Sequence, residues 1–423
     1  MADSICVFED TSYKKLLPLV YFRPVYDLRC GMQTLREKIQ RCYPRVPVAL
    51  HCRGYLAEAM KQQNPGARVN ALNNGSCLFI NGRVIADKDF VAQIPLRGKD
   101  ALYVQGETIV AARVSGGALQ AFEGALSNVF MPPDAAGLAK QEVKVSVINY
   151  PWDLISNNGK QIVADVKALT RGKKGKKIKG KVYQGALLVN KKDIFIDAGA
   201  KVKPGVVLDA ENGPIYIGKN VTVFSNATIE GPAFIGNGSL IKIGAKVYEN
   251  TSIGEMCKVG GEVEASIIHS HSNKQHDGFL GHAYLGMWVN LGADTNNSDL
   301  KNNYGNVKVY VNGEPVDSGS MFVGLTMGDH SKSGINTMFN TGTVVGVSCN
   351  VFGAGFPPKY VPSFSWGGAE GFTLYDPEKS IGVARRVMSR RKIEMTGVDE
   401  RLFRTVFELT ERDRARKIVT PGD

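Results

Sequence analysis

The sequence lacks the features that mark secreted, disulfide-stabilised and membrane proteins. Its seven cysteines form no C-x-x-C pair, so neither a zinc ribbon nor a disulfide framework is indicated. No run of about 18 apolar residues occurs, and the N-terminus, Met1-Ala-Asp-Ser, shows no charged segment followed by an apolar one. We therefore expect a cytoplasmic protein that is not exported and does not enter a membrane.

Acidic residues are the minority among the charged ones. The formal net charge is +12 at pH 7, which points to an anionic partner such as a nucleotide, coenzyme A or a sugar phosphate. No RNA-binding signature with interleaved aromatic residues accompanies this charge, so we expect no nucleic-acid partner. A chain of 423 residues has room for two or three domains, and its 47 glycines suit a fold rich in turns.

A six-residue repeat fills the segment from residue 217 to residue 259. Small residues stand two places before its last six anchors, and glycine follows several anchors. Neither an α-helix nor an alternating strand has this period, whereas a parallel β-helix does, with one aliphatic side chain per repeat pointing into a narrow core. We therefore predict a parallel β-helix. Its anchors are Ile217, Val223, Ile229, Ile235, Ile241, Val247, Ile253 and Val259.

The repeat is interrupted twice, and we expect ligands at the interruptions. It breaks after Val259, returns at Leu285 and Leu291, breaks again for an asparagine-rich loop, and resumes from Met327 to Val351. Insertions in a solenoid collect on one face, which is usually the binding face. Four of the six histidines lie in the first break: His269, His271, His276 and His282.

These histidines allow two interpretations. Neutral imidazoles are ligands for zinc or iron, and β-helices of the carbonic anhydrase class bind a metal with three histidines between subunits. Alternatively, one histidine is a general base, because acyl transfer from a thioester to an amine needs a base with a near-neutral pKa. The spacing does not choose between them.

The rest of the chain divides around the repeat. Short strands alternate with helices before it, which predicts an α/β domain with a largely parallel sheet and a ligand at the carboxyl ends of the strands. We expect helices over 377–392 and 398–417 to cap the open end of the β-helix. Alternatively, the arginines of the first helix bind a diphosphate group. The expected division is an α/β domain (1–150), a connecting helix and basic linker (151–185), the β-helix (186–355) and a C-terminal extension with helices (356–423).

Two stretches of the N-terminal segment resemble the sugar nucleotidyltransferase family. Phe22-Arg23-Pro24, with Gly31 and Thr34-Leu35-Arg36, resembles the segment that holds the nucleoside triphosphate, and Leu78 to Gly82 resembles the strand that delivers a metal-binding aspartate. The resemblance implies nucleotide contacts for Arg23 and Arg36, with UTP or dTTP as substrate, and Mg²⁺ only if the domain is active. The glycine-rich loop of the family is absent, however, and Arg83 stands where the aspartate is expected, where a cation would repel the metal.

A second resemblance covers the predicted β-helix. Val259 to Glu264, Ser272 to Gly281, Val289 to Ala293 and Asn303 to Gly305 are similar to the acetyltransferase half of the bifunctional glucosamine-1-phosphate acetyltransferase and N-acetylglucosamine-1-phosphate uridylyltransferase family. A bacterial variant with a shortened nucleotidyltransferase-like domain resembles the chain still more. The resemblance implies a left-handed β-helix of hexapeptide repeats, a homotrimer with sites between subunits, and acetyl-CoA as the acyl donor.

The same resemblance implies roles for individual residues. His276 falls on the catalytic base of the family, and Asn290 falls on an asparagine that binds the sugar. Amide side chains donate and accept hydrogen bonds, which suits hydroxyl-rich ligands. Ser266 stands where the family has a lysine, so the acceptor is less well defined. The other matched positions are Phe279 in place of a tyrosine, Asn303 and Tyr304 at the substrate, Ala293 in the acetyl-CoA tunnel, and Lys242 in place of a phosphate-binding arginine.

We therefore expect an acetyl-CoA-dependent N-acetyltransferase of nucleotide-sugar biosynthesis that acts on an amino-sugar phosphate, with glucosamine 1-phosphate as the expected acceptor. One alternative is a sugar-1-phosphate nucleotidyltransferase whose β-helix only assembles the oligomer. The other is a metal-binding or purely structural β-helix protein.

Overall fold

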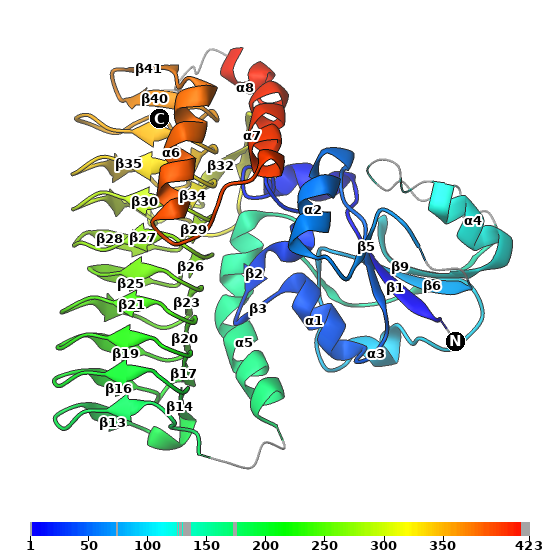
Figure 1. Cartoon of the computed structure of the whole chain (residues 1–423), viewed down its shortest axis with the longest axis horizontal. Helices are drawn as coiled ribbons and strands as arrows, with labels where there is room; N and C mark the ends of the chain where they lie inside the picture. The colour runs from blue at the N-terminus through cyan, green and yellow to red at the C-terminus, as the bar shows by residue number, and fades with distance from the viewer. Residues whose placement is uncertain are drawn as a thin grey trace.

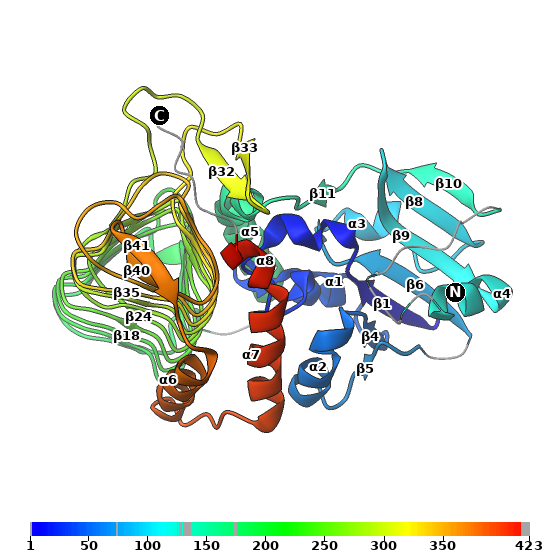
Figure 2. The same ribbon diagram turned by 90° about the horizontal axis from the view of Figure 1, so that it is seen from above.

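The computed structural model describes residues 2–72, 75–124, 126, 129, 137–171 and 176–415. An α/β domain from the N-terminal part of the chain lies beside a long β-helix, with a connecting helix between them (Figure 1). Seen from above, the β-helix is three-sided, and the C-terminal helices lie between it and the α/β domain (Figure 2).

The α/β domain is built on a mixed sheet. Strand β9 is antiparallel to both of its neighbours and the other pairings are parallel, so the largely parallel sheet is as predicted. The order is β10 (Ala139–Glu142), β8 (Ala101–Gln105), β9 (Thr108–Ser115), β6 (Ser76–Asn81), β1 (Ser4–Phe8), β4 (Val48–Leu50) and β5 (Arg68–Val69). The helices are α1 (Leu35–Cys42), α2 (Ala57–Gln63), α3 (Phe90–Gln93) and α4 (Gly116–Gly124).

Helix α5 (Pro151–Thr170) connects the α/β domain to the β-helix. The helix begins at Pro151, a residue that suits the first helical position. The backbone N–H of Tyr150, just before the helix, donates to the Asp153 carboxylate at 3.0 Å, which stabilises the start of the helix. Its buried Asp165 accepts from the Lys38 ammonium at 2.6 Å. The predicted basic linker follows this helix, and its residues 172–175 lie outside the described residues.

In the described part of the chain, three long parallel sheets form the faces of the β-helix. The docking sheet comprises β14 (Ile194–Ile196), β17 (Ile215–Ile217), β20 (Ala233–Ile235), β23 (Thr251–Ile253), β26 (Ile267–Ile268), β29 (Tyr284–Leu285), β34 (Thr326–Met327), β37 (Val344–Val345) and β39 (Tyr360–Val361). The cleft sheet comprises β12 (Lys181–Val182), β15 (Lys201–Val202), β18 (Thr222–Val223), β21 (Leu240–Ile241), β24 (Lys258–Val259), β27 (Asn273–Lys274), β30 (Asn290–Leu291), β35 (Lys332–Ser333), β38 (Asn350–Val351) and β40 (Ser365–Gly368). The outer sheet comprises β13 (Leu187–Val189), β16 (Val207–Asp209), β19 (Thr228–Glu230), β22 (Lys246–Val247), β25 (Glu262–Glu264) and β28 (Phe279–Gly281), followed by the pair β31 (Asn296–Asn297) and β36 (Met338–Phe339).

The predicted anchors form the core of this β-helix. Each is at most 1% exposed, and anchors three repeats apart are paired in register, as Ile217 is with Ile235 and Ile235 with Ile253. Three repeats therefore make one coil, and the observed architecture agrees with the predicted left-handed β-helix of hexapeptide repeats. Parallel pairing continues beyond the expected end at residue 355, because β39 and β40 add another coil.

The two breaks in the repeat differ in kind. The expected insertion after Val259 is not found, since the coil continues through Val263, Ile268, Lys274 and Leu280 with shortened turns. The second break is a true excursion between β31 and β34, which includes the hairpin of β32 (Lys308–Val311) and β33 (Glu314–Asp317).

The C-terminal helices do not cap the β-helix, contrary to the sequence-based expectation. They are α6 (Pro377–Ser389), α7 (Gly397–Leu409) and α8 (Glu411–Ala415). Ile381 of α6 and Val406 of α7 share a hydrophobic core with Met60 of the α/β domain and Phe364 of the β-helix. The apolar faces of these helices are therefore buried between the two larger units, while the last coil ends in a hairpin of β40 with β41 (Gly371–Leu374).

Buried ion pairs join the α/β domain to the docking sheet side of the β-helix. The Arg23 guanidinium donates to both carboxylate oxygens of Asp329, and the two side chains are 7% and 4% exposed. The Arg29 guanidinium, which is 5% exposed, donates at 2.7 Å to Glu255, whose side chain is 37% exposed. Charges buried as deeply as those of Arg23 and Asp329 are tolerated only when they are paired, so this contact fixes the relative position of the two units.

None of the described helices combines the length and apolar character that crossing a membrane requires. All seven cysteines carry free thiols.

The buried pair predicts a strong dependence of stability on Asp329. In an Asp329→Asn variant, the Arg23 guanidinium stays buried without a counter-charge, so we expect the free energy of unfolding in urea to fall by about 3–5 kcal/mol. Glu58→Gln is the matched control, because the Arg401–Glu58 pair also joins the α/β domain to α7 but its side chains are 59% and 60% exposed. That change should cost less than about 1 kcal/mol, and equal losses in the two variants would contradict the assignment.

Candidate functional site

His276 lies where the coil turns from the cleft sheet to the outer sheet. It belongs to the turn between β27 and β28, and it is exposed. Ala293 occupies the corresponding turn of the next coil, where the backbone N–H of Asp294 donates to the carbonyl of Asp277 at 3.1 Å. The structure therefore places His276 and Ala293 on neighbouring coils of one edge. We call this column of turns, at residues 242–244, 260–261, 275–278, 292–295 and 334–336, the His276 edge.

Lys242 lies on the His276 edge as well. It directly follows β21, and its side chain lies beside Gly260 in the next turn of the edge. A Cβ built on Gly260 would lie 3.1 Å from the Cβ of Lys242. The Lys242 ammonium lies 5.6 Å from the centre of the Phe224 ring. Three of the residues selected from the sequence therefore share one edge.

Lys274 is an unusual residue in the core of the coil that carries His276. It occupies the inward position that Val259 fills in the previous coil and Leu291 in the next, and it is 1% exposed. Its ammonium donates to the carbonyl oxygen of His276 at 2.8 Å and to that of Asp277 at 3.3 Å. Burial lowers the pKa of Lys274 to about 8, against the opposing effect of Asp277. A buried cation therefore holds the turn of His276 from inside.

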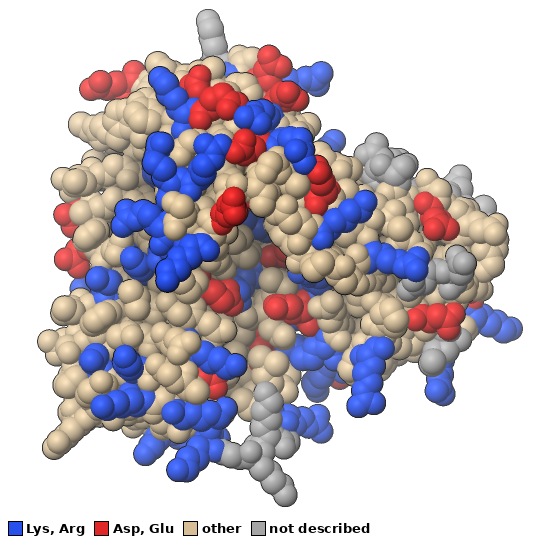
Figure 3. Space-filling view, in the orientation of Figure 1, with Lys and Arg blue, Asp and Glu red and all other residues tan. Residues whose placement is uncertain are grey.

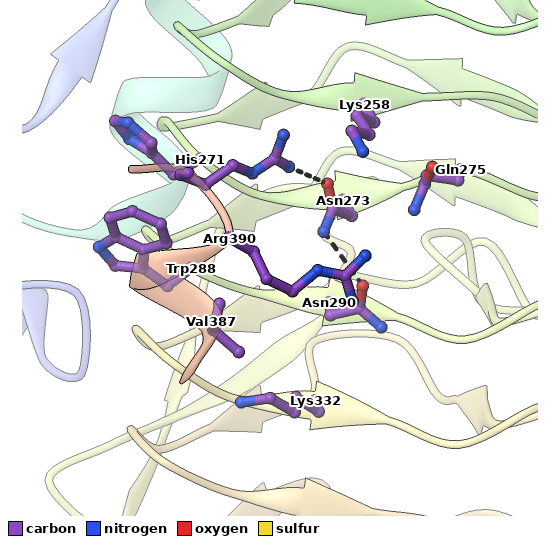
Figure 4. Close-up of a pocket in the computed structure, with 10 residues that line it drawn as sticks. Lys258, His271, Asn273, Gln275, Trp288, Asn290, Lys332, Val387 and Arg390 are labelled. Carbon is purple, nitrogen blue, oxygen red and sulfur yellow. Dashed lines mark hydrogen bonds between the residues drawn. The ribbon is translucent and has the colours of Figure 1, made fainter. Parts of the chain in front are cut away.

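A cleft lies beside the His276 edge, between the cleft sheet and α6 (Figure 4). Its volume is about 320 Å³. Asn290, a residue selected from the sequence, lines it, and so does Gln275, the neighbour of His276. The Arg391 guanidinium donates to the side-chain oxygen Oδ1 of Asn273 at 2.7 Å, and the side-chain NH₂ group of Asn273 donates to Oδ1 of Asn290 at 3.2 Å. The cleft thus contains an ordered amide network, with the stacked rings of His271 and Trp288 at one side.

The cleft is strongly cationic. Lys258, Lys332, Arg390 and Arg391 line it, and among the described residues no aspartate or glutamate does. Lysine and arginine side chains also gather on the surface over α6 and the adjoining β-helix (Figure 3). Burial, and then repulsion by Arg391 and Arg390, lowers the pKa of Lys258, and burial lowers the pKa of Lys332 to about 8. The positive charge of this cleft favours the binding of an anion.

The remaining residues predicted for the substrate lie elsewhere in a single chain. Phe279 is the first residue of β28, and its backbone N–H donates to the side-chain oxygen of Asn296 at 2.7 Å. Asn303 and Tyr304 belong to the excursion after β31, where Tyr304 is 69% exposed. One subunit therefore does not bring Asn303 and Tyr304 to the cleft.

Three of the four clustered histidines have partners that differ from one another. The His269 ring lies 2.9 Å from the carbonyl oxygen of Asp27, His271 stacks on Trp288, and His282 lies 2.8 Å from the Asp299 carboxylate. Burial, followed by repulsion from Arg23 and Arg29, lowers the pKa of His269 well below its usual value. No three histidine, cysteine, aspartate or glutamate side chains in the described ranges are placed to hold a metal ion. This geometry gives no support to the metal-binding interpretation.

In the α/β domain, the two arginines predicted to contact a nucleotide are paired with carboxylates of the protein itself. Arg23 is committed to Asp329, and the Arg36 guanidinium lies 2.9 Å from the Asp27 carboxylate. At the carboxyl end of β6, Arg83 is buried and donates to Asp10 at 2.6 Å and to the carbonyl oxygen of Ile148 at 3.1 Å. The expected ligand position at the strand ends is thus filled by the protein's own ion pairs, and the residues there do not fit Mg²⁺.

Sequence reasoning missed most of the cleft. Lys258, Asn273, Asn290 and Lys332 all come one position before an inward residue of the cleft sheet, so they point outward on successive coils. The repeat alone predicts that these four side chains point outward. It does not predict that α6 lies over these strands, because the position of α6 depends on packing with α7 and the α/β domain.

The inward Lys274 predicts an alkaline effect on stability. Because its pKa falls from 10.5 in the unfolded chain to about 8 in the folded one, the unfolded state binds more protons between these values, and stability should rise with pH there. Relative to Lys274→Met, the wild-type chain should gain up to roughly 3 kcal/mol in free energy of unfolding between pH 8 and pH 10.5. Urea titrations of both proteins across this range measure it, and parallel pH profiles would refute the assignment.

Comparisons with known proteins agree with both parts of this architecture. Residues 5–174 match the family model of sugar nucleotidyl transferases. The bifunctional protein GlmU of Acaryochloris marina is 30% identical over 161 residues, covering 38% of this chain and 30% of GlmU. A bifunctional sugar-1-phosphate nucleotidylyltransferase/acetyltransferase of Sulfurisphaera tokodaii is 31% identical over 104 residues, covering 24% of this chain and 26% of its own length. A crystal structure of UDP-N-acetylglucosamine acyltransferase aligns with a TM-score of 0.26 at 14% identity, over 57% of this chain and 83% of that one.

The chain spans about a third of the length of the curated relatives it matches. Residues 5–174 are therefore similar to sugar nucleotidyl transferases, and part of the chain is similar to the bifunctional protein GlmU.

Proposed function

We propose that the protein is an acetyl-CoA-dependent N-acetyltransferase that acts on an amino-sugar phosphate, with glucosamine 1-phosphate as the expected acceptor. The observation that carries the proposal is the exposed imidazole of His276 beside a cationic cleft that contains Asn290. A relative named as a sugar-1-phosphate nucleotidylyltransferase/acetyltransferase supports the same activity. Acyl transfer to a sugar amine requires a base and an anchor for the phosphate, which His276 and the cationic cleft would supply.

In the proposed reaction, His276 takes a proton from the amine of the bound sugar. The amine nitrogen attacks the thioester carbonyl carbon, so that a C–N bond forms while the C–S bond breaks. The thiolate of coenzyme A leaves and is protonated, and the transient oxyanion is stabilised by backbone N–H groups. Ala293, one coil from His276, would line the path of the acetyl group, and Phe279 would border the acceptor.

We infer that the working form is a homotrimer. The His276 edge exposes Ile243 and Ile335, which are 71% and 70% exposed and flank the turns of His276 and Ala293. Apolar side chains on one edge favour contact with a second copy. A neighbouring subunit would then supply Asn303 and Tyr304, which lie away from the cleft within one chain.

A cytoplasmic location belongs to the same proposal. Acetyl-CoA is a cytoplasmic metabolite, and seven free thiols suit a reducing compartment.

Removal of the base should abolish acetyl transfer. We expect His276→Ala to lower kcat at least about a hundredfold, because general-base catalysis contributes roughly 10²–10⁴-fold. Release of coenzyme A from acetyl-CoA and glucosamine 1-phosphate measures it. Asp277→Asn is the matched control, since its side chain lies in the same turn and should retain activity. Full activity of His276→Ala would refute the assignment.

Nucleotidyl transfer is the second candidate, supported by the family match of residues 5–174. The ion pair of Arg83 with Asp10 opposes it, because a guanidinium stands where a metal-binding carboxylate is needed. We therefore expect no magnesium-dependent release of pyrophosphate from UTP or dTTP with a sugar 1-phosphate. A phosphate-release assay coupled to pyrophosphatase checks this, and turnover that is lost on removing Mg²⁺ would overturn our interpretation of Arg83.

A further inference from the structure

We propose that α6 closes the acceptor site as a phosphate clamp, in which Lys258, Arg390 and Arg391 bind the phosphate monoester and Asn290 binds a hydroxyl of the same sugar. The identity of the sugar rests on the proposed function. The phosphate chemistry rests on the cleft itself.

The first argument is the unbalanced charge of the cleft. Lys258 and Arg390 have no acidic partner among the described residues, and Arg391 donates only to the neutral amide of Asn273. Arginines on the other sides of the same helix pair behave differently: Arg385 pairs with Glu400, and Arg404 of α7 pairs with Glu378 at 2.7 Å. Lys258, Arg390 and Arg391 therefore gather around one cleft without a carboxylate among the residues that line it, and an anionic ligand would compensate their charge.

The second argument is geometric. Arg390 reaches from α6 toward Asn290, and Lys258 faces it from β24, so the cations approach the same space from the helix and from the sheet (Figure 4). Guanidinium groups bind phosphate oxygens in pairs, while an ammonium adds a point charge. At about 320 Å³, the cleft is near the lower limit for small-ligand sites, which is roughly 300 Å³. A monosaccharide phosphate suits this volume.

The third argument is the order of the amide network. Because Arg391 donates to the side-chain oxygen Oδ1 of Asn273, the NH₂ group of the same side chain points the other way, and it donates to Oδ1 of Asn290. This chain orients Asn290 with its own NH₂ group available as a donor to a sugar hydroxyl. Arg391 would therefore both bind the phosphate and set the direction of the hydroxyl-binding amide.

Calorimetric binding to the full chain, without acetyl-CoA, tests the clamp. We expect Arg390→Ala to weaken binding of glucosamine 1-phosphate about tenfold or more, because a charge-assisted hydrogen bond contributes roughly 1.5–3 kcal/mol. Binding of unphosphorylated glucosamine should be unchanged, and inorganic phosphate should compete with the sugar phosphate. Arg386→Ala is the matched control: it removes the same charge from an exposed position of the same helix that does not line the cleft.

Equal affinities of Arg390→Ala and Arg386→Ala for the sugar phosphate would overturn the clamp. So would the absence of any difference between glucosamine and its phosphate in the wild-type protein. The outcome is separable from the proposed function: phosphate-dependent binding without coenzyme A release would keep the clamp and refute acetyl transfer. Acetyl transfer that is unaffected in Arg390→Ala would overturn the clamp alone.

Discussion

Stacking of branched aliphatic side chains in a narrow core determines where every other part of this protein lies. Each coil can bury its anchors only against the anchors of the next coil, so the spacing of the repeat sets the register along all three faces. Once the inward positions are fixed, the residue before each anchor of the cleft sheet must point outward. Lys258, Asn273, Asn290 and Lys332 are aligned in this way, so the column that forms the core also forms the floor of the cleft.

The exceptions to the repeat are as informative as the repeat itself. Lys274 takes an inward position in the coil of His276, where an aliphatic residue would be the stable choice. Its burial is disfavoured by loss of hydration, and hydrogen bonds to two carbonyl oxygens of the adjacent turn offset part of that cost. Lys274 therefore weakens the core while it orders the turn of His276, and such a departure from the repeat is expected where the position of a turn matters more than local stability.

The sequence allowed the β-helix and its core to be predicted, because these follow from a local period. It misplaced the C-terminal helices, since a helix with an apolar face can be buried against any complementary surface and the pattern of Ile381 and Ala384 does not name that surface. The arginines at the end of α6 stood out by composition, but only the structure shows that Arg390 and Arg391 line the same cleft as Lys258. Arg83 was correctly singled out, and its partner Asp10, distant in sequence, shows why the substitution is tolerated.

The α/β domain has a structural connection to the cleft that its similarity to sugar nucleotidyl transferases does not reveal. Arg23 holds Asp329, and the same carboxylate accepts from the backbone N–H of Met287 at 3.0 Å. Met287 precedes Trp288, whose ring stacks on His271 in the wall of the cleft and on His330, the neighbour of Asp329. The segment that carries Arg23 therefore supports the wall of the cleft. Because the two units share this carboxylate, a shift of the α/β domain would be transmitted to Trp288 through two hydrogen bonds.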